Sequence, residues 1–186
     1  MCLHESCKKP LHASLIFVFF AKSKIPEREL LLRSSLIKCV APPWTAINDK
    51  ALPIDASILT VDQTGFGGTK ISTAESYTVL ESSIYKLFVQ FFINEASAFN
   101  LTVAEVVEPF GVCYSAGNLT ETRVGPAIPT VDLVMRSEEV FWRIFGGNSM
   151  VRIEKGGVDL WCLGFMDSGI RRRTAVVIRG HQVTNF

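Results

Sequence analysis

The chain has 186 residues, of which 48% are hydrophobic, and its formal net charge is +1. A chain of this length is expected to bury about 70% of its unfolded surface, which allows one domain with a substantial core. A charge this close to zero argues against a nucleic-acid-binding protein, and the apolar content is too high for a disordered chain. No apolar run approaches the roughly 20 residues of a membrane span.

The beginning of the chain differs in kind from the rest. The first 50 residues carry eight Lys or Arg against four Asp or Glu, whereas the remainder carries eleven against fourteen. The change falls near Pro42-Pro43, a pair that interrupts regular structure. Residues 11–21 are apolar and lysines follow them, which is the outline of a secretory signal without a clear cleavage site. We expect a divergent leader over 1–44, either a poor signal peptide or an unstructured segment, and a folded body over 45–186.

The body alternates short β-branched runs with turns, and it contains one strongly periodic helix. An apolar stripe recurs at helical spacing, with Ser82 or Ser83 as the predicted N-cap, so we expect a core-facing helix over 82–99. Its members are Ile84, Leu87, Phe88, Phe91, Phe92, Ala96 and Phe99. Gly156-Gly157 supplies the positive φ of a hairpin turn between SMVRI and LWCLGFM. The other strands are expected over residues 57–62, 69–72, 77–80, 106–115, 130–136, 140–145 and 174–178, so the fold is predicted to be mainly β.

Few residues suggest chemistry. Cys113 and Cys162 lie in apolar strands and are either buried free thiols or a disulfide, and their spacing does not decide between the two. No paired C-x-x-C motif and only three histidines are present, so neither a metal site nor a cofactor is predicted, and His181 lacks the partners of a catalytic triad. Asn100 and Asn118 begin N-x-T sequons in expected loops, which would be glycosylation acceptors in a secreted protein or chance matches.

Two further motifs are interpreted as surface turns. Asp167-Ser168-Gly169 matches the tripeptide of a catalytic aspartate in aspartic peptidases. The next residue is Ile170, whereas a Ser or Thr that orients the carboxylate normally follows, and three arginines come directly after it. The arginine run 171–173 is too small, in an acidic body, to indicate a nucleic-acid site.

Several blocks, in the right order, resemble plant aspartic-protease-like proteins. The group is that of extracellular dermal glycoprotein, basic 7S globulin and the xylanase inhibitors, and the matching part is its C-terminal lobe, the xylanase-inhibitor C-terminal domain. The resemblance covers about residues 45 to 181. It rests on the blocks GTKISTAESYTVLESSIY (68–85), PFGVCYSAGNL (109–119), TRVGPAIPTVDLV (122–134), VFWRIFGGNSMVRI (140–153), CLGF (162–165) and RTAVVIRGHQV (173–183).

The resemblance implies a pepsin-like fold, of which this chain holds the C-terminal lobe with one main helix. It also implies a disulfide between Cys113 and Cys162, secretion, and glycosylation at the sequons. Relatives carry an apolar Gly-Gly-His-Gln run where this chain has Arg179 in place of the first glycine, so we expect a clash or a splayed strand there. The chain ends at Phe186, before the last strands of the family, so we expect the lobe to be incomplete at its C-terminus.

The resemblance also bears on catalysis. Ser72 occupies the position of the catalytic aspartate of active relatives, Thr73 that of the serine and Ala74 that of the glycine. Aspartic peptidases need two carboxylates that share one proton, and a serine hydroxyl cannot replace one of them. The first lobe, which would bring the other aspartate, is not in this sequence. We therefore expect a catalytically inactive homologue.

For function, the resemblance implies inhibitor-like binding of secreted cell-wall glycoside hydrolases such as a xylanase or a xyloglucan endoglucanase. Arg123 lies on a loop of the type that such inhibitors use, although a solvated loop arginine is the alternative. The other hypotheses are an aspartic-type endopeptidase, a storage or peptide-binding globulin, and a non-functional truncated fragment. A microbial glycoside hydrolase and the N-terminal lobe are the expected partners, and no nucleic acid or membrane is expected to bind.

Overall fold

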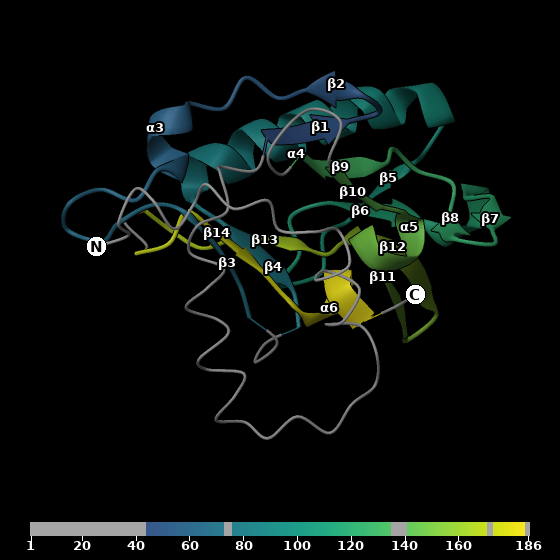
Figure 1. Ribbon diagram of the computed structural model, residues 1–186. Coiled ribbons are helices and arrows are strands. Elements are labelled where there is room, and N and C mark those ends of the chain that lie inside the picture. The colour runs from purple at the N-terminus through teal and green to yellow at the C-terminus, as the bar shows by residue number, and fades with distance from the viewer. Residues whose placement is uncertain (1–43, 73–75, 135–140, 171–172, 185–186) are drawn as a thin grey trace. The chain divides into compact units, whose positions relative to one another are not determined.

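The computed structural model describes residues 44–72, 76–134, 141–170 and 173–184, with one main helix and three four-stranded sheets (Figure 1). The expected leader therefore lies almost entirely outside the described residues. No helix among the described residues is long and apolar enough to cross a membrane. The mainly β architecture with a single long helix confirms the predicted fold class.

The three sheets bring together strands from distant parts of the chain. The first has the order β10-β9-β1-β2, with β1 Trp44–Ile47, β2 Lys50–Ala51, β9 Val131–Val134 and β10 Phe141–Ile144. The second has the order β11-β12-β6-β5, with β5 Val103–Ala104, β6 Cys113–Ser115, β11 Met150–Lys155 and β12 Val158–Leu163. The third has the order β13-β4-β14-β3, with β3 Thr69–Ile71, β4 Thr78–Leu80, β13 Phe165–Asp167 and β14 Val176–Ile178.

Helix α4, Ser82–Ala96, supplies much of the core. Of the predicted apolar stripe, Ile84, Phe88, Phe92 and Ala96 are buried. The other members, Leu87, Phe91 and Phe99, are partly buried. The Phe88 ring lies 4.7 Å, between centroids, from that of Phe165 on β13. A single 3₁₀ turn, η3 Ser97–Phe99, completes the predicted span to residue 99. The helix therefore packs the aromatic side chains at its centre onto the third sheet.

The predicted N-cap of this helix is wrong by one residue. Glu81 is the N-cap, and its carboxylate accepts a hydrogen bond of 2.8 Å from the Ser83 backbone N–H. The Ser82 hydroxyl instead donates to the Asp167 carboxylate at 2.6 Å. Serine is the commoner cap, but Ser82 is engaged by a distant partner that the local sequence does not reveal.

Replacing Glu81 with alanine should therefore lower the free energy of unfolding by about 1 kcal/mol, because it removes the cap. Chemical denaturation followed by circular dichroism measures the change. Glu105→Ala, at another exposed glutamate that caps no helix, is the control and should change stability little. Equal losses in the two variants would contradict the capping role.

Two predicted strands differ from the structure. The first part of the expected strand 57–62 belongs to the short helix α3, Ala56–Leu59, because Asp55 accepts from the Ser57 N–H at 2.9 Å and starts a helical turn. Of the expected strand 106–115, only β6 is regular. Pro109 has no N–H to donate to a ladder, and this interrupts the run. Local side-chain and proline effects override the β-branched pattern in both segments.

The hairpin of β11 and β12 forms as predicted. Gly156 and Gly157 have φ of 62° and 83°, which is the left-handed conformation that a two-residue hairpin turn needs. β12 continues the sheet to β6, where Cys162 and Cys113 are register partners. Their sulfur atoms form a disulfide and both residues are fully buried. This is the pairing that the family resemblance implies.

The third sheet is joined to the C-terminal helix α6, Gly180–Thr184, by one buried glutamine. The Gln182 side-chain carbonyl accepts from the Thr78 N–H at 3.1 Å and from its hydroxyl at 2.8 Å. Its amide nitrogen donates to the Gly164 carbonyl at 2.9 Å. Every polar atom of this side chain thus has a partner, as a buried amide requires.

The expectation that Arg179 would splay the adjacent strand is wrong. β14 stays paired with β3 as far as Ile178 and Ile71. The Arg179 backbone N–H donates to the Thr78 hydroxyl at 3.1 Å, and the residue is only 6% exposed. Burial lowers the pKa of the Arg179 guanidinium. The fold accommodates the larger side chain without breaking the ladder.

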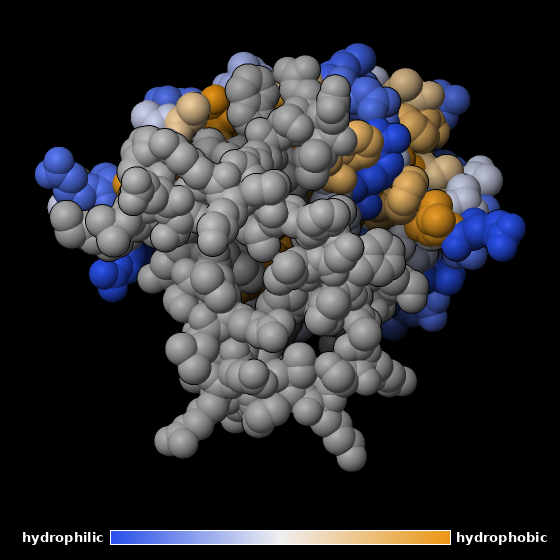
Figure 2. All heavy atoms as spheres, in the orientation of Figure 1, coloured by the Kyte–Doolittle hydropathy of each residue, from blue (hydrophilic) through white to orange (hydrophobic). Residues whose placement is uncertain are grey.

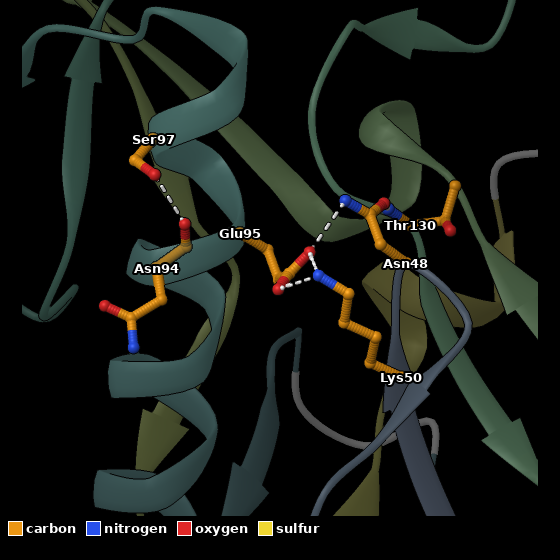
Figure 3. A network of polar contacts seen from close by, with 6 residues as sticks. All are labelled: Asn48, Lys50, Asn94, Glu95, Ser97 and Thr130. Atoms are coloured by element: carbon orange, nitrogen blue, oxygen red, sulfur yellow. Dashed lines mark hydrogen bonds and ion pairs between the residues drawn. The ribbon is translucent and has the colours of Figure 1, made fainter.

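A polar cluster ties the β1–β2 hairpin to the end of α4 (Figure 3). The Lys50 ammonium lies 2.7 and 3.0 Å from the two Glu95 carboxylate oxygens. The Asn48 side chain donates to Glu95 at 3.4 Å and accepts from the Thr130 N–H at 3.2 Å. The hydrogen bond from Lys50 lowers the pKa of Glu95. These contacts hold the first sheet against the helix.

Candidate functional site

The candidate site is built around a small hairpin whose tip presents Arg123. Strands β7, Glu121–Thr122, and β8, Gly125–Pro126, pair in antiparallel fashion, which leaves Arg123 and Val124 as the two-residue loop. The Thr122 hydroxyl donates to the Gly125 carbonyl at 2.6 Å and accepts from the Val124 N–H at 3.2 Å. The tip is therefore closed by its own hydrogen bonds.

Backbone contact with helix α5, Gly146–Ser149, fixes the hairpin further. The Gly147 N–H donates to the Val124 carbonyl at 2.8 Å. Gly125 has φ of 96°, and a Cβ there would lie 2.1 Å from the Gly147 nitrogen. A Cβ on Gly146 would lie 2.1 Å from the Pro126 carbonyl oxygen. Glycine is thus needed on both sides of the contact, because only its backbone allows this approach.

A groove of about 400 Å³ lies beside the tip. Two of its apolar residues are substantially exposed, Val124 at 50% and Phe145 at 40%. Over β7, β8 and α5, Figure 2 shows apolar and strongly hydrophilic atoms side by side. The residues that matter for its chemistry are Arg123, Val124, Trp142, Arg143, Phe145 and Asn148.

The second arginine of the groove, Arg143, forms ion pairs with two carboxylates. Arg143 and Asp132 are register partners on β10 and β9, and the guanidinium holds the buried Asp132 carboxylate with two bonds, of 2.8 and 2.7 Å. It also contacts Asp49. The hydrogen bonds to Asp132 raise the pKa of Arg143. Because two carboxylates face this one guanidinium, Arg143 shapes the wall of the groove without adding net positive charge.

Arg123 has the opposite character. Its side chain is exposed, and none of the ion pairs found among the described residues involves its guanidinium. It stands on a tip held by a backbone hydrogen bond to α5, next to exposed apolar surface. A planar guanidinium with five donors in this setting is suited to bind a carboxylate pair or another bidentate acceptor.

Ser72, for which the resemblance predicts the place of a catalytic aspartate, lies at one end of the third sheet. Ser72 directly follows β3, and its N–H donates to the Ile178 carbonyl at 2.8 Å. The neighbouring end of β4 holds Thr78, which the buried Gln182 binds. Thr73 and Ala74 lie outside the described residues. The described part of this position therefore contains a serine and hydrogen-bonded backbone, and no carboxylate faces it in the contacts of the described residues.

Asp167 is far from that position in the sheet. β13 is parallel to β4 with Asp167 opposite Leu80, at the end away from Thr78. The carboxylate accepts from the Ser82 hydroxyl and, at 2.8 Å, from the Gly169 N–H. Gly169 has φ of 82°. The Asp-Ser-Gly match forms a turn whose carboxylate also binds the Ser82 side chain at the start of α4, which agrees with its interpretation as a turn.

The remaining predicted residues are placed as follows. Asn100 and Asn118 are both exposed, at the ends of η3 and η4, Ala116–Asn118. The His181 ring nitrogen bonds the Met150 carbonyl at 2.9 Å, and burial lowers the pKa of His181. Among the described residues there is no group of three or more His, Cys, Asp or Glu that could hold a metal ion.

Sequence reasoning missed two pairs that shape these sites. One is Asp132 with Arg143, and the other is Thr78 with Gln182. A signal existed for the first pair, because each charged residue interrupts an apolar strand at the middle of its run. For the second pair the partners are 104 residues apart, and no local pattern joins them.

The comparisons with known proteins agree with this architecture. The family model described as xylanase inhibitor C-terminal matches residues 45–186, and the chain belongs to this family. "Probable aspartic proteinase GIP1" of Glycine max is 79% identical over 137 residues, which are 74% of this chain and 32% of that protein. "Probable aspartic proteinase GIP2" of Nicotiana benthamiana is 47% identical over 137 residues, 74% of this chain and 30% of that protein.

Solved structures show the same lobe. The crystal structure of edgp superposes with a TM-score of 0.73 and 45% identity, over 78% of this chain and 34% of that chain. Basic 7S globulin from soybean gives a TM-score of 0.61 and 28% identity, over 78% of this chain and 36% of that chain. The chain thus spans about a third of the length of these aspartic-protease-like plant proteins.

Proposed function

We propose that residues 45–186 form an inhibitor-type binding lobe that docks on the substrate cleft of a secreted microbial glycoside hydrolase, a xylanase or a xyloglucan endoglucanase. The observation that carries the proposal is Arg123, which stands on a hairpin tip that a backbone hydrogen bond holds to α5. Its guanidinium is exposed and has no ion-pair partner in the part of the chain that the structure describes. The xylanase-inhibitor family membership supports the same class of partner.

The chemistry of the partner explains why an arginine would serve. A retaining glycosidase holds two carboxyl groups about 5 Å apart, and an inverting one holds them somewhat further apart. A guanidinium can bind such carboxylates through two parallel hydrogen bonds, which fixes its orientation as well as its affinity. Arg143 is less suited to this role, because its Nε and Nη2 groups already bind Asp132 and Asp49.

The surface around Arg123 would supply the apolar part of the interface. Val124 and Phe145 are exposed beside the groove, so burying them on docking would contribute through the hydrophobic effect. The backbone contacts with α5 hold the tip in place before binding, which reduces the entropy lost on association. An interface centred on one arginine with an apolar surround is typical of binding hot spots.

The test is an inhibition assay with the full chain. We expect the purified chain to slow microbial xylanase or xyloglucan endoglucanase, in proportion to its concentration, under acidic conditions. An amylase serves as a glycoside hydrolase outside the proposed class and should be unaffected. Unchanged rates of both target enzymes at micromolar concentrations of a folded chain would refute the proposal.

We further propose that the chain is not a peptidase. Ser72 occupies the position of a catalytic aspartate, and a neutral hydroxyl can neither hold nor share the proton that the two-carboxylate mechanism moves. In this proposal Ser72, Thr73 and Ala74 are a degenerate form of the catalytic loop. The aspartic-protease-like relatives support the origin of the loop and leave its activity to be tested.

Casein or haemoglobin incubated with the chain at acid pH should therefore stay intact, with pepsin as the positive control. The reason is the absence of a titratable carboxylate at position 72. Peptide release that pepstatin abolishes would contradict the assignment. The peptidase assay and the hydrolase-inhibition assay test separate proposals, because an inactive peptidase homologue need not inhibit a hydrolase.

Secretion completes the proposed setting. An extracellular protein meets microbial hydrolases, and it also keeps a disulfide such as that between Cys113 and Cys162 oxidised. The matches to "Gamma conglutin 1" of Lupinus albus, at 34% identity, and "Basic 7S globulin" of Glycine max, at 31%, favour a storage or peptide-binding globulin as the second candidate. That candidate predicts no effect in the hydrolase assay.

A further inference from the structure

The two sequons, which are 18 residues apart in the chain, meet on one edge of the second sheet. β5 pairs with β6, and the Ser115 N–H donates to the Thr102 carbonyl at 3.0 Å. This ladder brings Asn100-Leu101-Thr102 beside Asn118-Leu119-Thr120. Asn100 and Asn118 are both exposed at that edge. Two acceptor motifs therefore form one local cluster.

One hydrogen bond joins the groups that glycosylation needs. The Asn118 side-chain nitrogen donates to the Thr102 hydroxyl oxygen at 2.7 Å. That nitrogen is the atom that would carry a glycan in its own sequon. That hydroxyl belongs to the Asn100 sequon, where the N-x-[ST] pattern requires it two residues after the asparagine. In the folded chain each sequon thus engages an essential group of the other.

The middle residue of each sequon adds a second constraint. Leu101 and Leu119 both pack against the main hydrophobic core. Asn100 is also held in the left-handed conformation with φ of 53°, where its N–H donates to the Ser97 carbonyl. Drawing either tripeptide into the active site of a transferase would require its leucine to leave the core, which is unfavourable because it exposes apolar surface to water.

We propose that Asn100 and Asn118 are paired N-glycosylation sites that accept oligosaccharide only before the segment 97–120 folds. In the transfer, the asparagine nitrogen attacks the anomeric carbon of an oligosaccharide carried on a polyprenyl pyrophosphate. A C–N bond forms and the C–O bond to the pyrophosphate breaks. The polyprenyl pyrophosphate leaves with the bonding electrons, and one amide proton passes to a base of the transferase.

The order of events along the chain favours this timing. Both sequons precede Cys162, so a chain that enters a secretory compartment from its N-terminus exposes them before the partner of Cys113 arrives. Once the disulfide forms, it ties β6 to β12, and through the β5–β6 ladder it holds both sequons. Oxidative folding therefore makes both sequons inaccessible to the transferase.

The test uses the full, unglycosylated chain with a purified oligosaccharyltransferase and its lipid-linked donor. One sample is folded with the disulfide formed, and the other is unfolded by reduction and alkylation. Near-ultraviolet circular dichroism verifies each state, and peptide mass spectrometry measures occupancy at each asparagine. We expect both sites to be modified in the unfolded chain and at least tenfold less modification of either in the folded chain.

Two variants separate the hydrogen bond from general folding. Asn118→Ala releases the Thr102 hydroxyl and should raise modification of folded Asn100 several-fold, although not to the level of the unfolded chain. Asn94→Ala, at an exposed asparagine on α4 outside any sequon, is the matched control and should have no effect.

Equal modification of folded and unfolded chains would overturn the proposal, as would failure of the unfolded chain to accept at either asparagine. An unchanged Asn100 occupancy in folded Asn118→Ala would overturn the role of the hydrogen bond. Neither result bears on hydrolase inhibition, because Arg123 lies outside this cluster.

Discussion

Replacing both Cys113 and Cys162 with alanine should lower the free energy of unfolding by about 4 kcal/mol. The two cysteines are separated by 49 residues, and loop-closure entropy for a cross-link of that span gives this magnitude. The disulfide lies at directly paired positions of β6 and β12, and both residues are fully buried. Denaturation in guanidinium chloride, followed by tryptophan fluorescence, measures the loss.

Reduction of the unmodified chain provides the control for this variant. It breaks the same bond but keeps both sulfur atoms in the core, so it should reproduce most of the lost stability. A larger loss in the alanine variant then reports the packing of the missing sulfur atoms. If the alanine variant unfolded at the same midpoint as the oxidised chain, the cross-link would contribute nothing to the fold.

Arg123→Ala should weaken hydrolase inhibition about 100-fold, which corresponds to roughly 2.7 kcal/mol of binding free energy. The expected cause is the loss of paired hydrogen bonds to the carboxylates of the partner's cleft. Arg123→Lys should recover only part of the affinity, because an ammonium keeps the charge but not the planar, two-pronged geometry. Inhibition constants from steady-state rates measure both changes.

Arg173→Ala is the matched control for the arginine at the hairpin tip. Arg173 is also exposed, but it lies on the loop before β14, apart from the groove beside Arg123. We expect its replacement to leave the inhibition constant unchanged. Equal losses of inhibition in the two variants would contradict a specific role of Arg123 and would indicate a general effect of positive charge. In that case added salt would weaken inhibition by the unmodified chain, because it screens exposed charges.

The elements that sequence predicts well are those whose side chains follow a repeating pattern. The four-residue spacing of Ile84, Phe88, Phe92 and Ala96 indicates α4, because one face of a helix must meet the core. The Gly156-Gly157 turn is equally local, since its positive φ values favour glycine. In both cases the cause of the structure lies within a few residues.

The features that sequence reasoning predicts wrongly depend on distant partners or on competing local bonds. The N-cap of α4 is Glu81 because Ser82 turns to Asp167, which is 85 residues away. The expected strand 57–62 overlaps the helix α3, which forms because Asp55 caps its first turn. Arg179 is buried next to β14 and leaves the pairing of that strand intact. A comparison with the glycine of related sequences predicts a clash there instead.

The candidate site also has one feature that the sequence predicts and others that depend on distant contacts. Arg123 is predicted on a loop, and the structure places it on the tip of the β7–β8 hairpin. What makes the tip rigid is its backbone contact with Gly146 and Gly147, and no motif announces that contact. The neighbouring Arg143 could be mistaken for a second binding arginine until its pairing with Asp132 is known.

The order of the third sheet has a consequence for how the protein reaches its folded state. β4 is flanked by β13 and β14, and Gln182 reaches across 104 residues to bind Thr78. Contacts between residues so far apart in the sequence slow folding, because the entropy of closing a long loop is lost before the contacts can stabilise the fold. We therefore expect α4 and the β11–β12 hairpin to form early, and the centre of the lobe to assemble only after β14 has emerged from the ribosome.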